Sequence, residues 1–119
     1  SFYYPNLENE TNRRFVEAYR KEYDQPPDTI ACQGYDTGNI MAKAVEEAGS
    51  TEPDALIEVL KGISLQSPRG SFTMDPETHN PIQNYYIGEN ARDGVRIVDT
   101  IEDVGMPSRP PEGYDPSGG

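Results

Sequence analysis

The segment "GYDTGNIMAKAVEEAGS", residues 34–50, decides how this chain folds. When the segment is extended back to residue 30, its apolar and small residues recur at steps of three and four, which is the spacing of one helix face. Asp28 is placed to cap the start of such a helix, and Gly49 is placed to end it. We therefore predict one long helix over residues 28–48. The residues that share its face are Ile30, Gly34, Gly38, Met41, Val45 and Ala48.

Two glycines lie on that face, Gly34 and Gly38. A glycine inside a helix costs about 1 kcal/mol relative to alanine, so we expect a compensating gain. The gain that glycine offers is close approach, because without a side chain a second backbone can come into contact with the helix. We therefore predict that the glycine face is tightly packed.

The remaining elements follow from the period of the apolar residues. Helical spacing predicts further helices over residues 9–23 and 52–61, with Thr11 and Thr51 as their caps. Alternation with a period of two then predicts short strands. The predicted fold class is α/β: three helices followed by a small antiparallel group of strands, over residues 70–75, 82–88 and 94–101.

Composition and charge limit the function. The net charge is −11, from 21 acidic and 10 basic residues, which argues against nucleic acid and against an anionic membrane surface as partners. Only 34% of the residues are apolar, so a large self-contained core is not expected. The beginning, "SFYYPNL", and the proline- and glycine-rich end indicate a piece of a larger protein. We expect a folded segment over residues 1–101 and a tail over residues 102–119.

The sequence shows little that indicates catalysis. His79 is the only histidine, and the cluster Asp75, Glu77 and His79 lies in "DPETHN", where ordinary turn formers predict a turn rather than a metal site. Cys32 is the only cysteine and is expected to be a small buried residue. No nucleophile elbow, phosphate loop or dinucleotide fingerprint is present. We predict no enzyme activity, no cofactor and no metal.

The eight tyrosines are more informative. Tyr85 and Tyr86 should point to opposite faces of a strand, so that one of them is partly exposed. Tyr3, Tyr4 and Tyr35 differ, because each lies at an element boundary or beside a glycine. There a tyrosine can offer a ring and a hydroxyl to a small ligand, although ordinary packing stays the alternative for each.

Taken in order, several motifs resemble those of a known family over about residues 1–100. The chain is similar to the C-terminal third of the branched-chain amino acid binding proteins. These are the substrate-binding subunits of ATP-driven (ABC) importers and have the type I periplasmic binding fold. The motifs are "FVEAYRKEY" (15–23), "PPD" (26–28), "GYD" (34–36), "KAVEEAGS" (43–50), "PRGSFTMDPETHN" (68–80) and "YYIG" (85–88).

The resemblance implies two doubly wound α/β lobes, joined by three crossover strands, that close around a ligand. By that analogy "SFYY" is the end of a crossover strand, and "GYD" lies on a helix near the hinge. The candidate ligand-binding residues are therefore Tyr3, Tyr4, Tyr35 and Asp36. The alternative for Asp36 is that it only satisfies backbone groups at the hinge.

The function expected from the resemblance is that of a fragment of an extracytoplasmic solute receptor, periplasmic or extracellular, with a lipid anchor as one option. Its ligand would be a small amino acid, an amide or an aromatic acid. Its partners would be that ligand, the importer's permease and the remaining lobes of the same protein. The alternatives are a ligand-sensing regulatory domain of the same fold and, less favoured, an enzyme.

Overall fold

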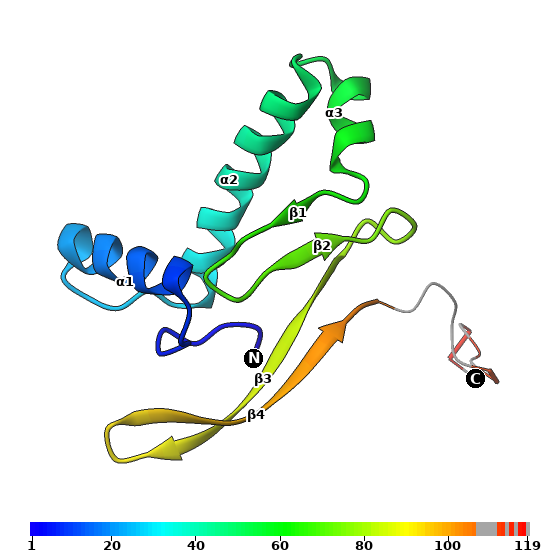
Figure 1. Ribbon diagram of the computed structural model, residues 1–119. Helices are drawn as coiled ribbons and strands as arrows, with labels where there is room; N and C mark the ends of the chain where they lie inside the picture. The colour runs from blue at the N-terminus through cyan, green and yellow to red at the C-terminus, as the bar shows by residue number, and fades with distance from the viewer. Residues whose placement is uncertain (107–111, 114, 116, 119) are drawn as a thin grey trace.

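The computed structural model describes residues 1–106, 112–113, 115 and 117–118. Three helices are followed by four strands, which confirms the predicted order (Figure 1). The helices are α1 (Glu10–Tyr23), α2 (Thr29–Ala48) and α3 (Pro53–Leu60). The strands are β1 (Ser64–Leu65), β2 (Phe72–Met74), β3 (Pro81–Ala91) and β4 (Gly94–Val104).

Local signals set the ends of α1 and α2. Asp28 caps α2 as predicted, and Gly49 ends α2 in the left-handed conformation with φ 62°. The cap predicted for α1 was wrong. Asn9, not Thr11, takes that position, and its side chain accepts a hydrogen bond from the Asn12 amide at 2.7 Å. Thr11 is therefore the second residue of the helix.

The third helix lacks the predicted cap. The N-cap position of α3 is Glu52, which makes no side-chain capping bond, so the cap predicted at Thr51 was wrong. Pro53 fills the first helical position, where its missing amide hydrogen is not needed. None of the helices within the described residues combines the length and apolar character needed to cross a bilayer.

The strands form one antiparallel sheet in the order β1-β2-β3-β4. The two-residue strand β1 was not predicted, because it is too short to show alternation. Strands β3 and β4 are longer than predicted and make a hairpin that extends away from the helices (Figure 1). The hairpin ends at Val104, inside the predicted tail, while residues 107–111, 114, 116 and 119 of that tail lie outside the described residues.

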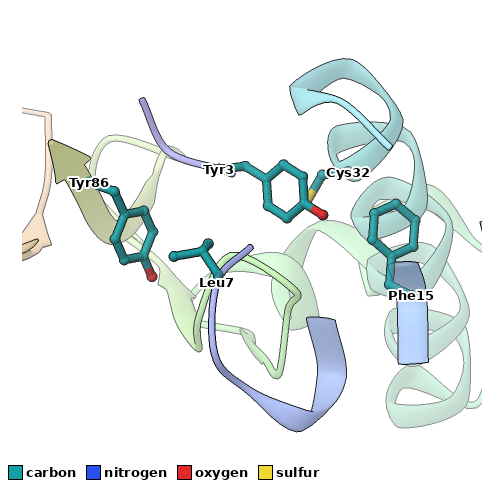
Figure 2. Packing of buried hydrophobic residues seen from close by; sticks show 5 residues of the cluster. All are labelled: Tyr3, Leu7, Phe15, Cys32 and Tyr86. Carbon is teal, nitrogen blue, oxygen red and sulfur yellow. The ribbon is translucent and has the colours of Figure 1, made fainter. Parts of the chain in front are cut away.

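The core is small and lies where the N-terminal segment meets α1, α2 and β3. Figure 2 shows the Tyr3 ring beside Cys32 of α2, with Phe15 of α1 beyond it and Leu7 on the other side. Tyr86 of β3 completes the cluster. The prediction for the tyrosine pair is confirmed, since Tyr86 is 6% exposed and its neighbour Tyr85 is 37% exposed.

The expectation of a tightly packed glycine face was wrong for this chain. A Cβ atom built on Gly34 or Gly38 meets nothing within 4 Å. The flanking side chains are open as well, since Ile30 is 77% exposed and Met41 is 42% exposed. The reason is that α3 packs beside the C-terminal half of α2 only (Figure 1), so the N-terminal half of this face is left bare.

The crowded glycine lies in the hairpin instead. A Cβ atom on Gly88 would lie 2.5 Å from Val95 Cγ1 and 2.8 Å from Tyr4 Oη.

We therefore predict that Gly88→Ala lowers the free energy of unfolding by about 1–3 kcal/mol, through overpacking. Gly34→Ala is the matched control, and it should raise that free energy by up to about 1 kcal/mol, because alanine is the better helix former. Urea denaturation measures both, and equal midpoints for Gly88→Ala and the wild type would contradict the close approach.

Candidate ligand-binding site around the tyrosines and Asp36

The four candidate residues divide between the interior and the surface. Tyr3 and Asp36 are buried, at 2% and 1% exposure. Tyr4 is partly buried, and its hydroxyl lies against the backbone of Gly88. Tyr35 is 42% exposed. Two of the four side chains are therefore enclosed, and the other two are partly or largely exposed.

Asp36 lies in a buried polar cluster that joins α2 to the loop between β1 and β2. Its Oδ2 accepts a hydrogen bond from Ser67 Oγ at 2.6 Å and lies 3.0 Å from Arg69 Nε. Both members of this ion pair are buried, with side chains 2% and 10% exposed. Within the described residues, Asp36 Oδ1 accepts no hydrogen bond. The sequence analysis missed Ser67 and Arg69, for which the only signal was a lone arginine in "PRG".

Burial controls the ionisation of this cluster. Desolvation raises the pKa of the Asp36 carboxyl above its ordinary value, and the Ser67 hydroxyl and the Arg69 guanidinium oppose that rise. Desolvation, helped by the neighbouring Asp36 carboxylate, also raises the pKa of the Cys32 thiol to about 12. A thiol with so little thiolate is a poor nucleophile, which agrees with the packing role predicted for Cys32.

The loop over residues 67–70 contacts three other segments besides α2. The carbonyl oxygen of Arg69 accepts a hydrogen bond from the Tyr86 hydroxyl of β3 at 2.6 Å. The carbonyl oxygen of Pro68 accepts one from the Asn9 side chain, ahead of α1, at 2.9 Å. The Arg69 guanidinium also lies over the Phe72 ring of β2, 4.6 Å from its centre. This loop is therefore the point at which the helices and the sheet are joined.

A second buried network holds the N-terminal segment. The Tyr3 hydroxyl donates to Asn12 Oδ1 at 2.8 Å. The Asn12 amide group donates in turn to the carbonyl oxygens of Pro5 and Leu7, at 3.0 and 2.8 Å. The sequence analysis did not select Asn12, because a polar residue near a helix start is common and its partners lie in a loop.

Aromatic rings connect this interior to the surface. The Tyr35 ring lies against Phe15, with the ring centres 4.6 Å apart, and Phe15 in turn contacts Tyr3 at 6.2 Å. Along α1 the contacts continue to Tyr19 and then to Tyr23. One side of the Tyr35 ring is thus supported by Phe15, while the residue stays 42% exposed.

A cavity of about 900 Å³ lies between residues 6–9 and the β3–β4 hairpin. None of the four candidate residues lines this cavity, nor either of two smaller cavities, one beside α3 and one beside α1. The residues that line it include Asn6, Asn9, Asn84, Tyr86 and Arg96.

The turn predicted in "DPETHN" is present. The Asp75 carboxylate there accepts hydrogen bonds from the backbone amides of Glu77 and Thr78.

The profile of the periplasmic binding protein family matches residues 1–94. The chain belongs to this family. A Leu/Ile/Val-binding protein homolog from Brucella abortus is 34% identical over 104 residues, which cover 81% of this chain and 27% of that protein. The chain therefore spans about a quarter of the length of this curated relative.

Solved structures of the family confirm the expected fold. A solute-binding protein of an ABC transporter from Rhodopseudomonas palustris BisB5, in complex with 3,4-dihydroxybenzoic acid, is 32% identical with a TM-score of 0.81. The match covers 89% of this chain and 31% of that one. A second R. palustris solute-binding protein, in complex with benzoate, is 30% identical with a TM-score of 0.75, over 86% of this chain and 30% of its own. The type I periplasmic binding fold and the predicted family are thus confirmed.

The ion pair of Asp36 and Arg69 gives a prediction with a defined pH dependence. Arg69→Met leaves a buried carboxylate without its cation, so the free energy of unfolding at pH 7 should fall by about 3–5 kcal/mol. Without the guanidinium the folded-state pKa of Asp36 rises further. The protonated form then stabilises the folded state at low pH, and this contribution is lost as the pH rises. The loss should therefore be smaller at pH 4 than at pH 7.

Arg96→Met is the matched control, since Arg96 pairs with Glu89 at 2.7 Å while its side chain is 71% exposed. An exposed pair contributes about 0–1 kcal/mol, so this variant should be close to the wild type at both pH values. Urea denaturation at pH 4 and pH 7 provides the measurement. Equal losses for the two arginine variants, or a loss at Arg69 that does not depend on pH, would contradict the buried ion pair.

Proposed function

We propose that this chain is part of an extracytoplasmic solute receptor that delivers a small carboxylic acid to an ABC importer. An aromatic acid is the preferred ligand, ahead of a small amino acid or an amide. The observation that carries this preference is the similarity to R. palustris solute-binding proteins of 25–32% identity, which hold 3,4-dihydroxybenzoic acid, benzoate and p-hydroxybenzoic acid. The receptor makes and breaks no bond.

Binding proceeds by hinge closure, in which a ligand that contacts both lobes stabilises the closed form. We assign direct ligand contacts to Tyr35 and Tyr4, because their rings are partly accessible. A flat aromatic acid would pack on the Tyr35 ring, which Phe15 supports from behind at 4.6 Å. Tyr3 and Asp36 are buried, so their role is to position these rings and the loop over residues 67–70.

The proposed location is the periplasm or the cell exterior, where the loaded receptor meets the permease of its importer. Relatives that are named as solute-binding proteins of ABC transporters support this location and this partner. The remaining lobe segments belong to the same receptor, and they supply the contacts on the other side of the cleft.

The test is calorimetric titration of this chain and of the longer protein encoded by its gene. The ligands are benzoate, p-hydroxybenzoate, 3,4-dihydroxybenzoate and leucine. The longer protein should bind at least one of the aromatic acids more than 100-fold tighter than leucine. The 119-residue chain should bind all four weakly or not at all, because it holds only some of the contacts that drive closure.

In the longer protein, Tyr35→Ala should weaken binding of the aromatic acid at least tenfold. Tyr19→Ala is the matched control, since the Tyr19 ring also contacts Phe15, with the ring centres 5.9 Å apart, but it belongs to α1 and packs against the core cluster. It should lower stability and leave the affinity unchanged. A preference for leucine would contradict the ligand class, and equal affinities of the two variants would contradict the site.

A further inference from the structure

We propose that Arg69 is a positioning residue for ligand binding, because it holds Tyr35 of α2 at a fixed place relative to β3. Arg69 acts through Asp36 on the side of the helix and through Tyr86 on the side of the sheet. This role requires no contact between Arg69 and the ligand. The proposal rests on the proposed function, since it takes Tyr35 as a ligand contact.

The side chain of Arg69 connects the loop over residues 67–70 to α2. Its Nε lies 3.0 Å from Asp36 Oδ2, and the same oxygen accepts a hydrogen bond from Ser67 Oγ at 2.6 Å. The backbone amide of Arg69 donates in turn to Ser67 Oγ at 3.2 Å. Asp36, Ser67 and Arg69 are all buried. One carboxylate oxygen of α2 is therefore held by two residues of the loop, away from solvent.

The backbone of Arg69 connects the same loop to β3. Its carbonyl oxygen accepts a hydrogen bond from the Tyr86 hydroxyl at 2.6 Å. The next residue is Gly70, with φ 97°, and a Cβ atom there would lie 3.0 Å from Tyr86 Oη. The loop thus passes so close to Tyr86 that a side chain at position 70 would crowd the hydroxyl. Tyr86 is itself fixed, because its backbone makes two hydrogen bonds with Ser1, of 2.9 and 2.8 Å.

The contact with Arg69 sets the rotation of α2 about its own axis near Tyr35. The buried residues of α2 are Cys32, Asp36 and Ala44. Cys32 makes its hydrogen bond within the helix, to Asp36, whereas Asp36 accepts one from the loop. Successive residues of a helix point about 100° apart, so a rotation that displaced Asp36 would carry the Tyr35 ring with it. The ion pair therefore fixes the direction in which Tyr35 points.

The place of Tyr35 relative to β3 matters because the other proposed ligand contact rests on that strand. Tyr4 Oη would lie 2.8 Å from a Cβ atom on Gly88, so Tyr4 packs on the backbone of β3. Arg69 contacts both α2, which carries Tyr35, and β3. Binding groups must be held within about 0.5 Å of their productive geometry. Loss of the Arg69 contacts should therefore weaken binding although no ligand-contacting group is removed.

The first test needs no ligand. The 119-residue chain contains no tryptophan, so Tyr35→Trp introduces a single fluorophore at the ligand-contact position. In that background Tyr86→Phe removes only the hydroxyl that bonds Arg69, and Arg69→Met removes the ion pair. Both changes should move the emission maximum of the indole to longer wavelength and lower its anisotropy, because the ring is held less firmly against Phe15. Circular dichroism establishes that each variant is folded at the temperature used.

Two controls separate positioning from general destabilisation. Tyr85→Phe removes the hydroxyl of the neighbouring residue, which is 37% exposed and packs on Phe2 with the ring centres 5.1 Å apart. Ile63→Ala opens a cavity at a buried residue that belongs to neither α2 nor the loop over residues 67–70. Neither control should change the emission of the folded chain.

The second test measures affinity in the longer protein encoded by the gene, with 3,4-dihydroxybenzoate as the probe. At a temperature where all variants are folded, Arg69→Met and Tyr86→Phe should each weaken binding by at least about threefold. Tyr85→Phe and Ile63→Ala should bind as the wild type does. When Tyr86→Phe is added to Tyr35→Ala, it should cause no further loss, because its effect passes through Tyr35.

The two proposals can fail separately. If 3,4-dihydroxybenzoate does not bind the longer protein, the proposal for that ligand fails, and the fluorescence of the 119-residue chain alone decides the role of Arg69. Unchanged emission in both Tyr86→Phe and Arg69→Met, or the same shift in Ile63→Ala, would overturn that role. Wild-type affinity of both variants, or a further loss when Tyr86→Phe is added to Tyr35→Ala, would overturn it as well. If Arg69→Met does not fold, Tyr86→Phe decides, since it removes one hydroxyl and leaves the ion pair in place.

Discussion

The buried ion pair between Asp36 and Arg69 is the interaction on which the rest of this structure depends. Removing two charges from water is costly, and the cost is tolerable only where the charges are paired and hydrogen-bonded. Ser67 donates a hydrogen bond to the Asp36 carboxylate, and the Arg69 guanidinium, 3.0 Å from that carboxylate at Nε, also lies over the Phe72 ring. The pair therefore specifies one arrangement of α2 against the loop between β1 and β2, because any other arrangement would leave a buried charge alone.

The same loop also positions β3 and the segment ahead of α1. Carbonyl oxygens of the loop accept hydrogen bonds from the side chains of Tyr86, in β3, and Asn9, ahead of α1. The loop therefore contacts both the helical part and the sheet. The first residue pairs with β3 through two backbone hydrogen bonds between Ser1 and Tyr86. The apolar cluster at this junction is small, so directional polar contacts do much of the positioning that a large core does elsewhere.

The same features bear on function. A receptor that closes around a ligand needs a rigid junction near its hinge and surfaces that meet other parts of the fold. The side chains of Asp36 and Tyr3 are buried and hydrogen-bonded, whereas Tyr35 and the glycine face are open. The acidity of the chain is compatible with this division, because the only charged residue of α2 between Thr29 and Ala42 is Asp36, which is buried.

The sequence by itself determined the three helices, the presence of the longer strands and the family. Helical spacing, the Asp28 cap and the alternation at Tyr85 and Tyr86 are local signals, because each involves residues close to one another in the sequence. Such signals can be interpreted without knowledge of the rest of the chain. Only the tertiary structure decided what those elements contact. The partner of Asp36 is Arg69, which is distant in the sequence, and the glycine face is bare because no described segment reaches it. The spacing of a helix face shows that it can be covered, but which segment covers it depends on long-range packing that local patterns do not encode.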